Sequence, residues 1–385
     1  MDGFLLSRAD RTLRAFGARD TYDTAAASIT ALSNGDTELI VGALPFDPER
    51  PAALTAPEFW EFTDGPWQPE SIPDLPMVSL TREVPAPAEH VSRVRSLIAR
   101  LRGGALEKVV AARSVALGAD SPISAEALVA RLIALDPAAN GFAVDLTAAG
   151  DSFRGHSLVG ASPEVLLSRR GRRVVCRPLA GTAPRRLDPA ADAQEGRALL
   201  ESAKNLAEHA FVTDWIREAL APLCSELSIP DSPVLTSTHE VWHLATPIEG
   251  ILRDPATSAL DLATVLHPTP AVCGTPTSLA MTTIKDIEED RRFYGGAVGW
   301  CDAEGDGDWV VAIRCAEITA DGREAIATAG GGIVAESDPE SELEETSTKL
   351  RTLLRAFALE QRPEHNGAPT RHHYRAPICS SLASG

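Results

Sequence analysis

The sequence lacks long apolar runs and is poor in cysteine. No stretch approaches the ~20 apolar residues that a membrane-spanning helix needs. The opening segment, MDGFLLSRAD, has no apolar core long enough for a secretory signal peptide, so we expect a cytoplasmic location. Only six of the 385 residues are cysteine, and none form a CxxC pair. We therefore expect reduced thiols, with neither a disulfide framework nor a zinc site.

Positive charge is also in short supply. The formal net charge is −18, from 36 basic and 54 acidic residues. Nucleic-acid binding needs a basic face, so this balance argues against a nucleic-acid partner. Hydrophobic residues make up 44% of the chain and charged residues 23%, as in globular proteins. We expect a monomer with no membrane partner, and any anionic substrate would need cations placed locally.

At 385 residues, the chain is long enough for one large domain or two. Residues 1–90 are interpreted as an N-terminal segment packed on the same fold, with a strand at 37–44 and an irregular, proline-rich stretch at 45–87. Residues 91–360 are predicted to form the catalytic domain, with helices at 91–101, 125–135 and 190–220. Residues 262–276 are expected to form a rigid loop because of their prolines. The tail, 361–385, lacks periodicity and is predicted to be disordered.

The segment at 329–354 carries the strongest functional signal. It opens with three glycines at 330–332, which suggest a loop with unusual dihedral angles and amides that a ligand can approach. A helix is predicted to follow, capped by Ser337 or Asp338, with Pro339 in its first turn.

Glu342 and Glu345 would lie on one face of that helix, with Lys349 one turn beyond Glu345. Two adjacent carboxylates repel each other unless a cation or a proton intervenes. An ordinary solvated helix start is the alternative, but next to the glycines we favour a divalent metal held by oxygen ligands.

Lys108 and Glu164 are candidates for a catalytic base and a catalytic acid. Lys108 lies among apolar residues in a predicted strand, where desolvation would let it act as a base. Alternatively, it lies at the open end of the strand and extends to water. Glu164 lies at a Ser-Pro kink before an apolar run, where burial would raise its pKa as a general acid requires. A surface glutamate at a strand edge is equally compatible with the local sequence.

Three further residues stand out by position. Glu208 is the member of a polar helical stripe that we expect to face inward, although such stripes are usually solvated. Arg314 lies in an apolar strand and needs an anionic partner, for which a substrate carboxylate is suited. His243, alone in a strand, is more often a core histidine than a catalytic one.

These motifs resemble one family over residues 91–359, the chorismate-utilising enzymes, and most closely its isochorismate synthases. The similar stretches are LEKVVAAR, LVGASPEVLL, RPLAGT, AKNLAEHA, VWHLATP, LHPTPAVCGTP, RRFYGGAVGWCDAEGDGDWVVAIRCAEI and AGGGIV followed by ELEETSTKL. The resemblance implies an α+β fold in which two antiparallel β-sheets pack face to face with helices outside. It also implies an enzyme whose substrate is chorismate and whose cofactor is Mg²⁺.

The resemblance assigns roles residue by residue. Lys108 would be the general base that activates water, and Glu164 the general acid. The implied metal ligands are Glu208, Glu342 and Glu345. The implied substrate contacts are Thr182, His243, Ala271, Tyr294, Arg314, Gly330, Gly332 and Lys349. The implied reaction is water addition at C2 of chorismate with loss of the C4 hydroxyl.

The residue at position 271 helps to distinguish isochorismate synthases from relatives that eliminate pyruvate. Many relatives that eliminate pyruvate carry threonine at that position, whereas isochorismate synthases resemble this chain in reading HPTPA. A salicylate synthase remains the alternative, weakened slightly because Asn205 stands where some salicylate synthases carry glutamate. An ammonia-using subunit, such as anthranilate synthase component I, and a non-catalytic chorismate-binding paralogue are further alternatives.

Overall fold

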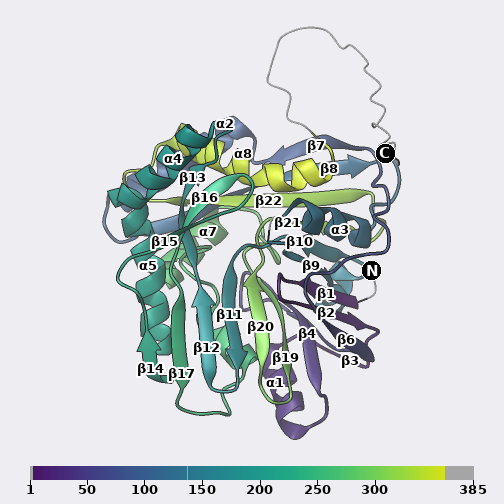
Figure 1. Cartoon of the computed structure of the whole chain (residues 1–385). Coiled ribbons are helices and arrows are strands. Elements are labelled where there is room, and N and C mark those ends of the chain that lie inside the picture. Colours follow the sequence, from purple (N-terminus) through teal and green to yellow (C-terminus); the bar gives the residue numbers. More distant parts are fainter. Residues whose placement is uncertain (1–2, 137, 360–385) are drawn as a thin grey trace, which may run out of the picture.

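The computed structural model describes residues 3–136 and 138–359, so the tail predicted to be disordered lies outside the described residues. Two large antiparallel sheets lie face to face with helices outside (Figure 1), which confirms the α+β fold predicted from the sequence. The helices are α1 (Ala25–Asn34), α2 (Pro87–Leu101), α3 (Ala125–Leu135), α4 (Pro189–Glu201), α5 (Ala203–Leu220), α6 (Ala259–Leu266), α7 (Thr277–Ile287) and α8 (Pro339–Ala356). Two short 3₁₀ turns lie at Thr147–Ala149 and Asp151–Phe153.

The ten-stranded sheet carries the glycine-rich segment. Its strands are β1 (Gly3–Ser7), β2 (Arg11–Phe16), β6 (Phe59–Asp64), β7 (Val78–Val84), β8 (Lys108–Ala119), β9 (Gly141–Asp145), β10 (Ser157–Gly160), β18 (Gly274–Thr275), β21 (Cys315–Ile318) and β22 (Glu324–Ile333). The order is β18-β8-β22-β21-β10-β9-β1-β2-β6, and β7 also pairs with β8. Strand β22 therefore lies inside the sheet, next to β8.

The nine-stranded sheet faces it. Its strands are β3 (Asp20–Tyr22), β4 (Leu39–Leu44), β5 (Ala53–Ala56), β11 (Val165–Arg170), β12 (Arg173–Arg177), β14 (Cys224–Ser228), β17 (Ile248–Leu252), β19 (Ala297–Asp302) and β20 (Gly307–Val311). They follow the order β14-β17-β12-β11-β20-β19-β4-β5-β3. A small third sheet contains β13 (Leu179–Pro184), β16 (Val241–Ala245) and β15 (Val234–Ser237). Strands from the first 64 residues belong to both large sheets.

Alternating side chains on the two sheets build three apolar layers. Between the sheets, Phe4 and Leu13 from one sheet pack in the same cluster as Val298 and Val310 from the other. Outside the ten-stranded sheet, α3 and α8 contribute a second cluster, and outside the nine-stranded sheet α5 and α6 contribute a third. Because each strand sends alternate residues to opposite faces, both faces of both sheets can be buried.

Several local predictions are confirmed. The helix at 125–135 matches α3, and the helix at 91–101 is the major part of α2. Asp338 caps α8 by accepting a hydrogen bond from the backbone N–H of Ser341, and Pro339 stands in the first turn, as expected. No helix among residues 3–136 and 138–359 is long and apolar enough to cross a membrane.

Other local predictions are wrong. The helix expected over 190–220 is broken at Ser202, whose side chain caps α5 by accepting from the backbone N–H of Asn205. The first residues of the segment at 262–276 belong to helix α6, which ends at Leu266 because His267 precedes a proline and therefore disfavours helical dihedrals. The proline-rich stretch at 45–87 contains β5, β6 and β7. Glycines 330–332 lie in strand β22, outside the left-handed region.

Candidate active site

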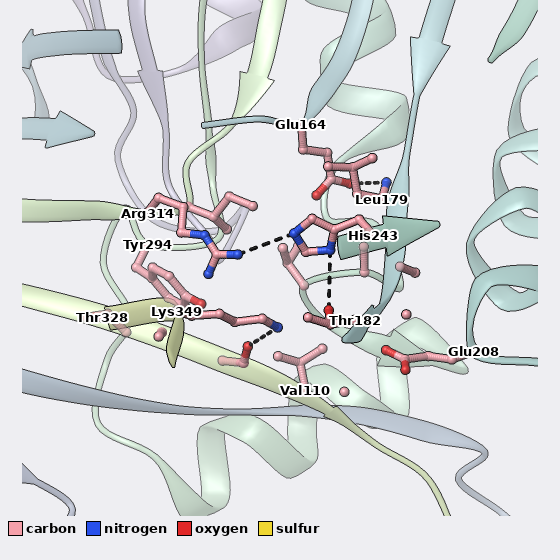
Figure 2. Close-up of a pocket in the computed structure, with 18 residues that line it drawn as sticks. Val110, Glu164, Leu179, Thr182, Glu208, His243, Tyr294, Arg314, Thr328 and Lys349 are labelled. Atoms are coloured by element: carbon pink, nitrogen blue, oxygen red, sulfur yellow. Dashed lines mark hydrogen bonds between the residues drawn. The ribbon is translucent and has the colours of Figure 1, made fainter. Parts of the chain in front are cut away.

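A pocket lies where β8 and β22 of one sheet meet β13, β16 and the loop after α6 (Figure 2). Most of the residues that the resemblance singled out line it: Glu164, Thr182, Glu208, His243, Ala271, Tyr294, Arg314, Gly330, Gly332 and Lys349. Of the other three, Lys108 lies beside Gly332, which lines the pocket, whereas Glu342 and Glu345 lie beside Gly331, which does not. The structure therefore brings together positions that are up to 241 residues apart, Lys108 to Lys349.

The glycines of β22 are required for space. A Cβ at Gly332 would lie 2.1 Å from Oε1 of Glu208 and 3.0 Å from Cε of Lys108. A Cβ at Gly330 would lie 2.8 Å from a methyl carbon of Val110 and 3.1 Å from the Tyr294 hydroxyl. These separations are shorter than side-chain contacts normally allow. The glycines therefore let the acid on α5 and the tyrosine approach the strand, and no positive φ is involved.

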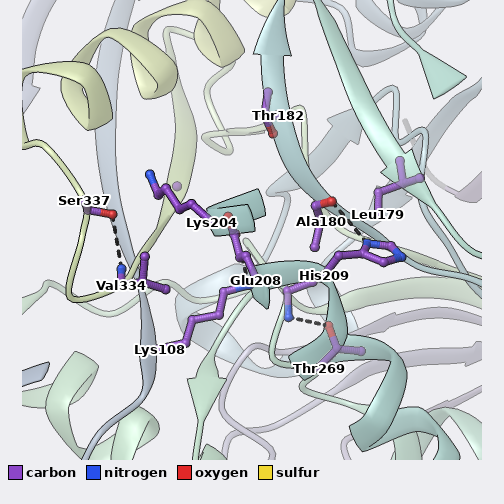
Figure 3. Close-up of polar contacts among 12 residues, drawn as sticks. Lys108, Leu179, Ala180, Thr182, Lys204, Glu208, His209, Thr269, Val334 and Ser337 are labelled. Atoms are coloured by element: carbon purple, nitrogen blue, oxygen red, sulfur yellow. Dashed lines mark hydrogen bonds and ion pairs between the residues drawn. The ribbon is translucent and has the colours of Figure 1, made fainter. Parts of the chain in front are cut away.

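Lys108, the first residue of β8, is fully buried. The alternative that its side chain extends to water is therefore wrong. Its Nζ lies 3.1 Å from Oε1 of Glu208 (Figure 3), a distance that fits an ion pair. The angle between Lys108 Nζ and the Glu208 carboxylate does not satisfy hydrogen-bond geometry. Nζ therefore has no hydrogen-bond partner among the described residues. A buried ammonium with one carboxylate beside it and unused donors is poised to interact with a ligand.

Glu208 is held in place by its neighbour His209. The His209 Nδ1 lies 3.1 Å from the carbonyl oxygen of Ala180, and Nε2 lies 2.7 Å from the Thr246 hydroxyl. Because a carbonyl only accepts, Nδ1 carries the proton and Nε2 accepts from Thr246. Burial lowers the pKa of His209 to about 4, so the ring is neutral near pH 7. This anchor fixes α5 against β13 and directs Glu208 into the pocket, a role that the sequence analysis missed.

Glu164 precedes β11 on the opposite sheet, and its side chain is 3% exposed. Burial raises its pKa to about 7, although the backbone N–H of Leu179 donates to Oε1 at 3.4 Å and opposes the rise. The predicted burial and raised pKa are confirmed, and the surface alternative is wrong. A carboxyl group with a pKa near 7 can be protonated at neutral pH and can donate that proton to a leaving group.

Arg314 enters the pocket from a strained backbone position. Its φ is +53°, in the left-handed region that non-glycine residues rarely adopt, and this breaks the expected continuous strand between β20 and β21. Its Nε is buried without a hydrogen-bond partner, and no carboxylate of the described residues lies within ion-pair distance. Burial lowers its pKa, yet guanidinium remains charged. A buried guanidinium without a carboxylate partner can bind an anion.

His243 links Arg314 to the third sheet (Figure 2). The Arg314 Nη2 donates to Nε2 of His243 at 3.4 Å, and Nδ1 lies 3.3 Å from the Thr182 hydroxyl. Since guanidinium only donates, Nε2 accepts and Nδ1 carries the proton. Burial, followed by the charge of Arg314, lowers the pKa of His243 well below its usual value. The neutral ring therefore orients Arg314. Thr182 lies in strand β13, which is irregular at Gly181.

The three predicted metal ligands border adjacent glycines, but each is next to a lysine. Besides the contact between Glu208 and Lys108, the Nζ of Lys204 lies 3.0 Å from Oε1 of Glu342, and the Nζ of Lys349 lies 2.5 Å from Oε1 of Glu345. Lys204 therefore gives the two carboxylates on α8 a second basic neighbour besides Lys349. Lys204 was missed, although it stands one helical turn before Glu208.

The donor set fits a hard cation. Oε2 of Glu342 is buried without a partner, and burial followed by the charge of Glu345 raises the pKa of Glu342 to about 7. Within the part of the chain that the structure describes, no three His, Cys, Asp or Glu side chains converge closely enough to hold a metal. Oxygen donors are what Mg²⁺ prefers, so the chemistry fits, but the three glutamates would have to exchange their lysine contacts for the metal.

Known proteins resemble this chain in sequence and in fold. Residues 39–358 match the family model described as chorismate binding enzyme. A Mycobacterium tuberculosis protein, provisionally named isochorismate synthase MenF, is 51% identical over 93% of this chain and 96% of its own length. Isochorismate synthase DhbC of Bacillus subtilis is 44% identical over 84% of this chain and 81% of its own.

Among solved structures, a Bacillus anthracis protein matches with a TM-score of 0.85 and 37% identity, over 93% of this chain and 96% of that one. Its title provisionally names it a 2,3-dihydroxybenzoate-specific isochorismate synthase, DhbC. The chain therefore belongs to the chorismate-binding enzyme family, and its similarity within that family is to the isochorismate synthases.

Proposed function

We propose that this protein is a Mg²⁺-dependent isochorismate synthase, which adds water at C2 of chorismate and expels the C4 hydroxyl. One observation carries the proposal. Glu164, a buried carboxyl group with a pKa of about 7, lines the pocket from the nine-stranded side, and Lys108, a fully buried lysine of the ten-stranded sheet, lies behind the pocket-lining Gly332. The reaction needs a base on one side of the ring and an acid on the other, and these residues meet both requirements.

The charges around the pocket suit a substrate with two carboxylates. Arg314 and Lys349 line the pocket, and Lys108 lies behind Gly332. These cations produce a locally positive field within a protein whose net charge is −18. We assign Arg314 to a substrate carboxylate, with Tyr294 beside it. Lys349 also donates to the carbonyl oxygen of Gly330 at 2.9 Å, which holds its Nζ at the floor of the pocket.

In its neutral amine form, Lys108 would take a proton from the attacking water, and Glu164 would give its proton to the departing hydroxyl. Glu208, 3.1 Å from Lys108, would help to keep the lysine side chain oriented. Glu208, Glu342 and Glu345 would hold Mg²⁺, which supplies positive charge to offset the carboxylates of the substrate. We further propose a cytoplasmic monomer whose product enters menaquinone or siderophore synthesis.

A salicylate synthase is the second candidate, because it would form the same intermediate before eliminating pyruvate. Ala271 lines the pocket and carries only a methyl group there. It cannot hydrogen-bond an intermediate and hold its enolpyruvyl arm for elimination, which favours release of isochorismate.

The acid and base roles can be tested with Lys108→Ala and Glu164→Gln. Each should lower kcat by roughly 10²-fold or more while changing KM little. Lys285→Ala, on the outer helix α7, is the matched control for loss of a lysine. Near-wild-type turnover in either site variant would overturn the assigned role. A loss of folding stability that accounts for the lost activity would assign a structural role instead.

A further inference from the structure

Strand β8, which begins with the proposed base Lys108, lacks a strand partner along part of one edge. On that edge it pairs with β18 at residues 108–109 and with β7 at residues 114–119. The backbone groups between these segments need other partners, because buried N–H and C=O groups are almost always paired. The N–H of Val110 donates to the carbonyl oxygen of Cys273 at 2.8 Å.

Two side chains complete this edge. The carbonyl oxygen of Val110 accepts from Nη2 of Arg291 at 2.7 Å, and the N–H of Ala112 donates to Oε1 of Glu288 at 2.7 Å. Glu288 follows helix α7 directly, and Arg291 lies three residues later. A carboxylate and a guanidinium thus occupy the place of a missing strand and satisfy its hydrogen bonds.

The same two side chains form a buried ion pair. Nε of Arg291 lies 2.7 Å from Oε2 of Glu288, Nη2 lies 2.9 Å from Oε1, and the two side chains are 2% and 3% exposed. The remaining nitrogen, Nη1, donates to the carbonyl oxygen of Val272 at 2.8 Å. The guanidinium also lies over the ring of Phe46, 4.5 Å from its centroid. One arginine therefore joins β8 to the loop that carries Ala271.

We propose that Glu288 and Arg291 are positioning residues, which fix Lys108 and the 271–273 loop relative to each other during the reaction. This inference rests on the proposed function, because it concerns how the same site is held. Bidentate, fully satisfied buried pairs are rigid, and the pair contacts β8 only two residues from Lys108. Displacing a catalytic group by about 1 Å can cost roughly 10²-fold in rate.

The chain offers a matched control in Arg169. Its side chain is 2% exposed, pairs with Asp306 at 2.8 Å, and donates to the carbonyl oxygens of Glu304 and Pro255. It therefore also combines one carboxylate with two backbone carbonyls. Arg169 joins the end of strand β11 to the β19–β20 hairpin and lines no part of the active-site pocket.

The test compares Arg291→Lys with Arg169→Lys. Lysine keeps the charge, but its three donors share one nitrogen and cannot reach the separated acceptors that the planar arginine fork contacts from different nitrogens. Both variants should unfold at similarly lower urea concentrations. Only Arg291→Lys should lower kcat, by roughly 10- to 100-fold, with KM changed less than about threefold. Amide hydrogen exchange should be faster at residues 108–112 in Arg291→Lys and unchanged there in Arg169→Lys.

Equal kcat losses in the two lysine variants, or unchanged kcat in Arg291→Lys, would overturn the proposal. If Arg291→Lys does not fold, the isosteric Glu288→Gln provides the same comparison against Asp306→Asn. The identity of the wild-type product separates this test from the proposed function. A product other than isochorismate would refute that function, whereas the exchange comparison would still report whether the pair fixes β8.

Discussion

Replacing Glu164 with glutamine should change how folding stability depends on pH. Burial raises the pKa of Glu164 from its usual 4.5 to about 7. One pKa unit corresponds to about 1.4 kcal/mol, so ionising this buried carboxyl group costs the folded state roughly 3 kcal/mol relative to the unfolded state. Glutamine has the same shape and no charge to bury.

The direction of the change in stability with pH follows from which state binds the Glu164 proton. Between pH 4.5 and 7 the folded protein keeps the Glu164 proton, whereas the unfolded chain has lost it. The contribution of this group to stability is therefore full below pH 4.5 and is lost as pH rises through about 7. As pH rises over this range, the free energy of unfolding of Glu164→Gln should therefore increase relative to that of the wild type. Glu342 also titrates near pH 7, but it does so in both proteins and cancels in the difference.

Urea unfolding of the wild type and Glu164→Gln, without substrate or metal, at several pH values from 5 to 8.5 measures this difference. We expect the free energy of unfolding of the variant, minus that of the wild type, to rise by roughly 2–3 kcal/mol across the range. Glu195→Gln, at the surface of α4, is the control for the amide substitution. A difference that stays constant with pH, or that falls, would refute the assignment of a buried, protonated Glu164.

Three other changes test the geometry of the pocket. Gly332→Ala places a methyl group against Glu208 and should cost roughly 1–3 kcal/mol in urea unfolding; an unchanged midpoint would contradict the close approach. Ala271→Thr should raise the ratio of pyruvate to isochorismate several-fold, since a satisfied hydroxyl is worth about 1 kcal/mol; a constant ratio would contradict the role of the loop. Lys204→Gln removes the cation beside Glu342 and should tighten Mg²⁺ binding in calorimetry; weaker binding would show that Lys204 supports the metal site.

Much of the candidate site could be predicted because its chemistry is visible along the chain. Lys108 and Glu164 are charged residues among apolar ones, a setting that marks them as candidates; their local sequence left exposure open, and the structure shows both to be buried. The spacing of Glu342 and Glu345 places them on one helical face, and Asp338 and Pro339 mark where that helix begins.

The features that were missed depend on contacts between distant segments. Nothing local to Glu342 indicates that Lys204 reaches it from another helix. Glycines permit both loops and close approaches, so the crowding of Gly332 against Glu208 required knowledge of where α5 lies. The pairing of Arg291 with β8 depends on an edge left open between β18 and β7, which strand propensity does not encode.

The central claim is that the protein converts chorismate to isochorismate, and the most direct measurement is product quantification. The wild type is incubated with chorismate and Mg²⁺, products are separated by chromatography, and pyruvate is measured in parallel with lactate dehydrogenase. We predict isochorismate as the main product, little pyruvate, and loss of turnover in the presence of a chelator. Stoichiometric pyruvate and salicylate, or no turnover of chorismate under these conditions, would contradict the claim.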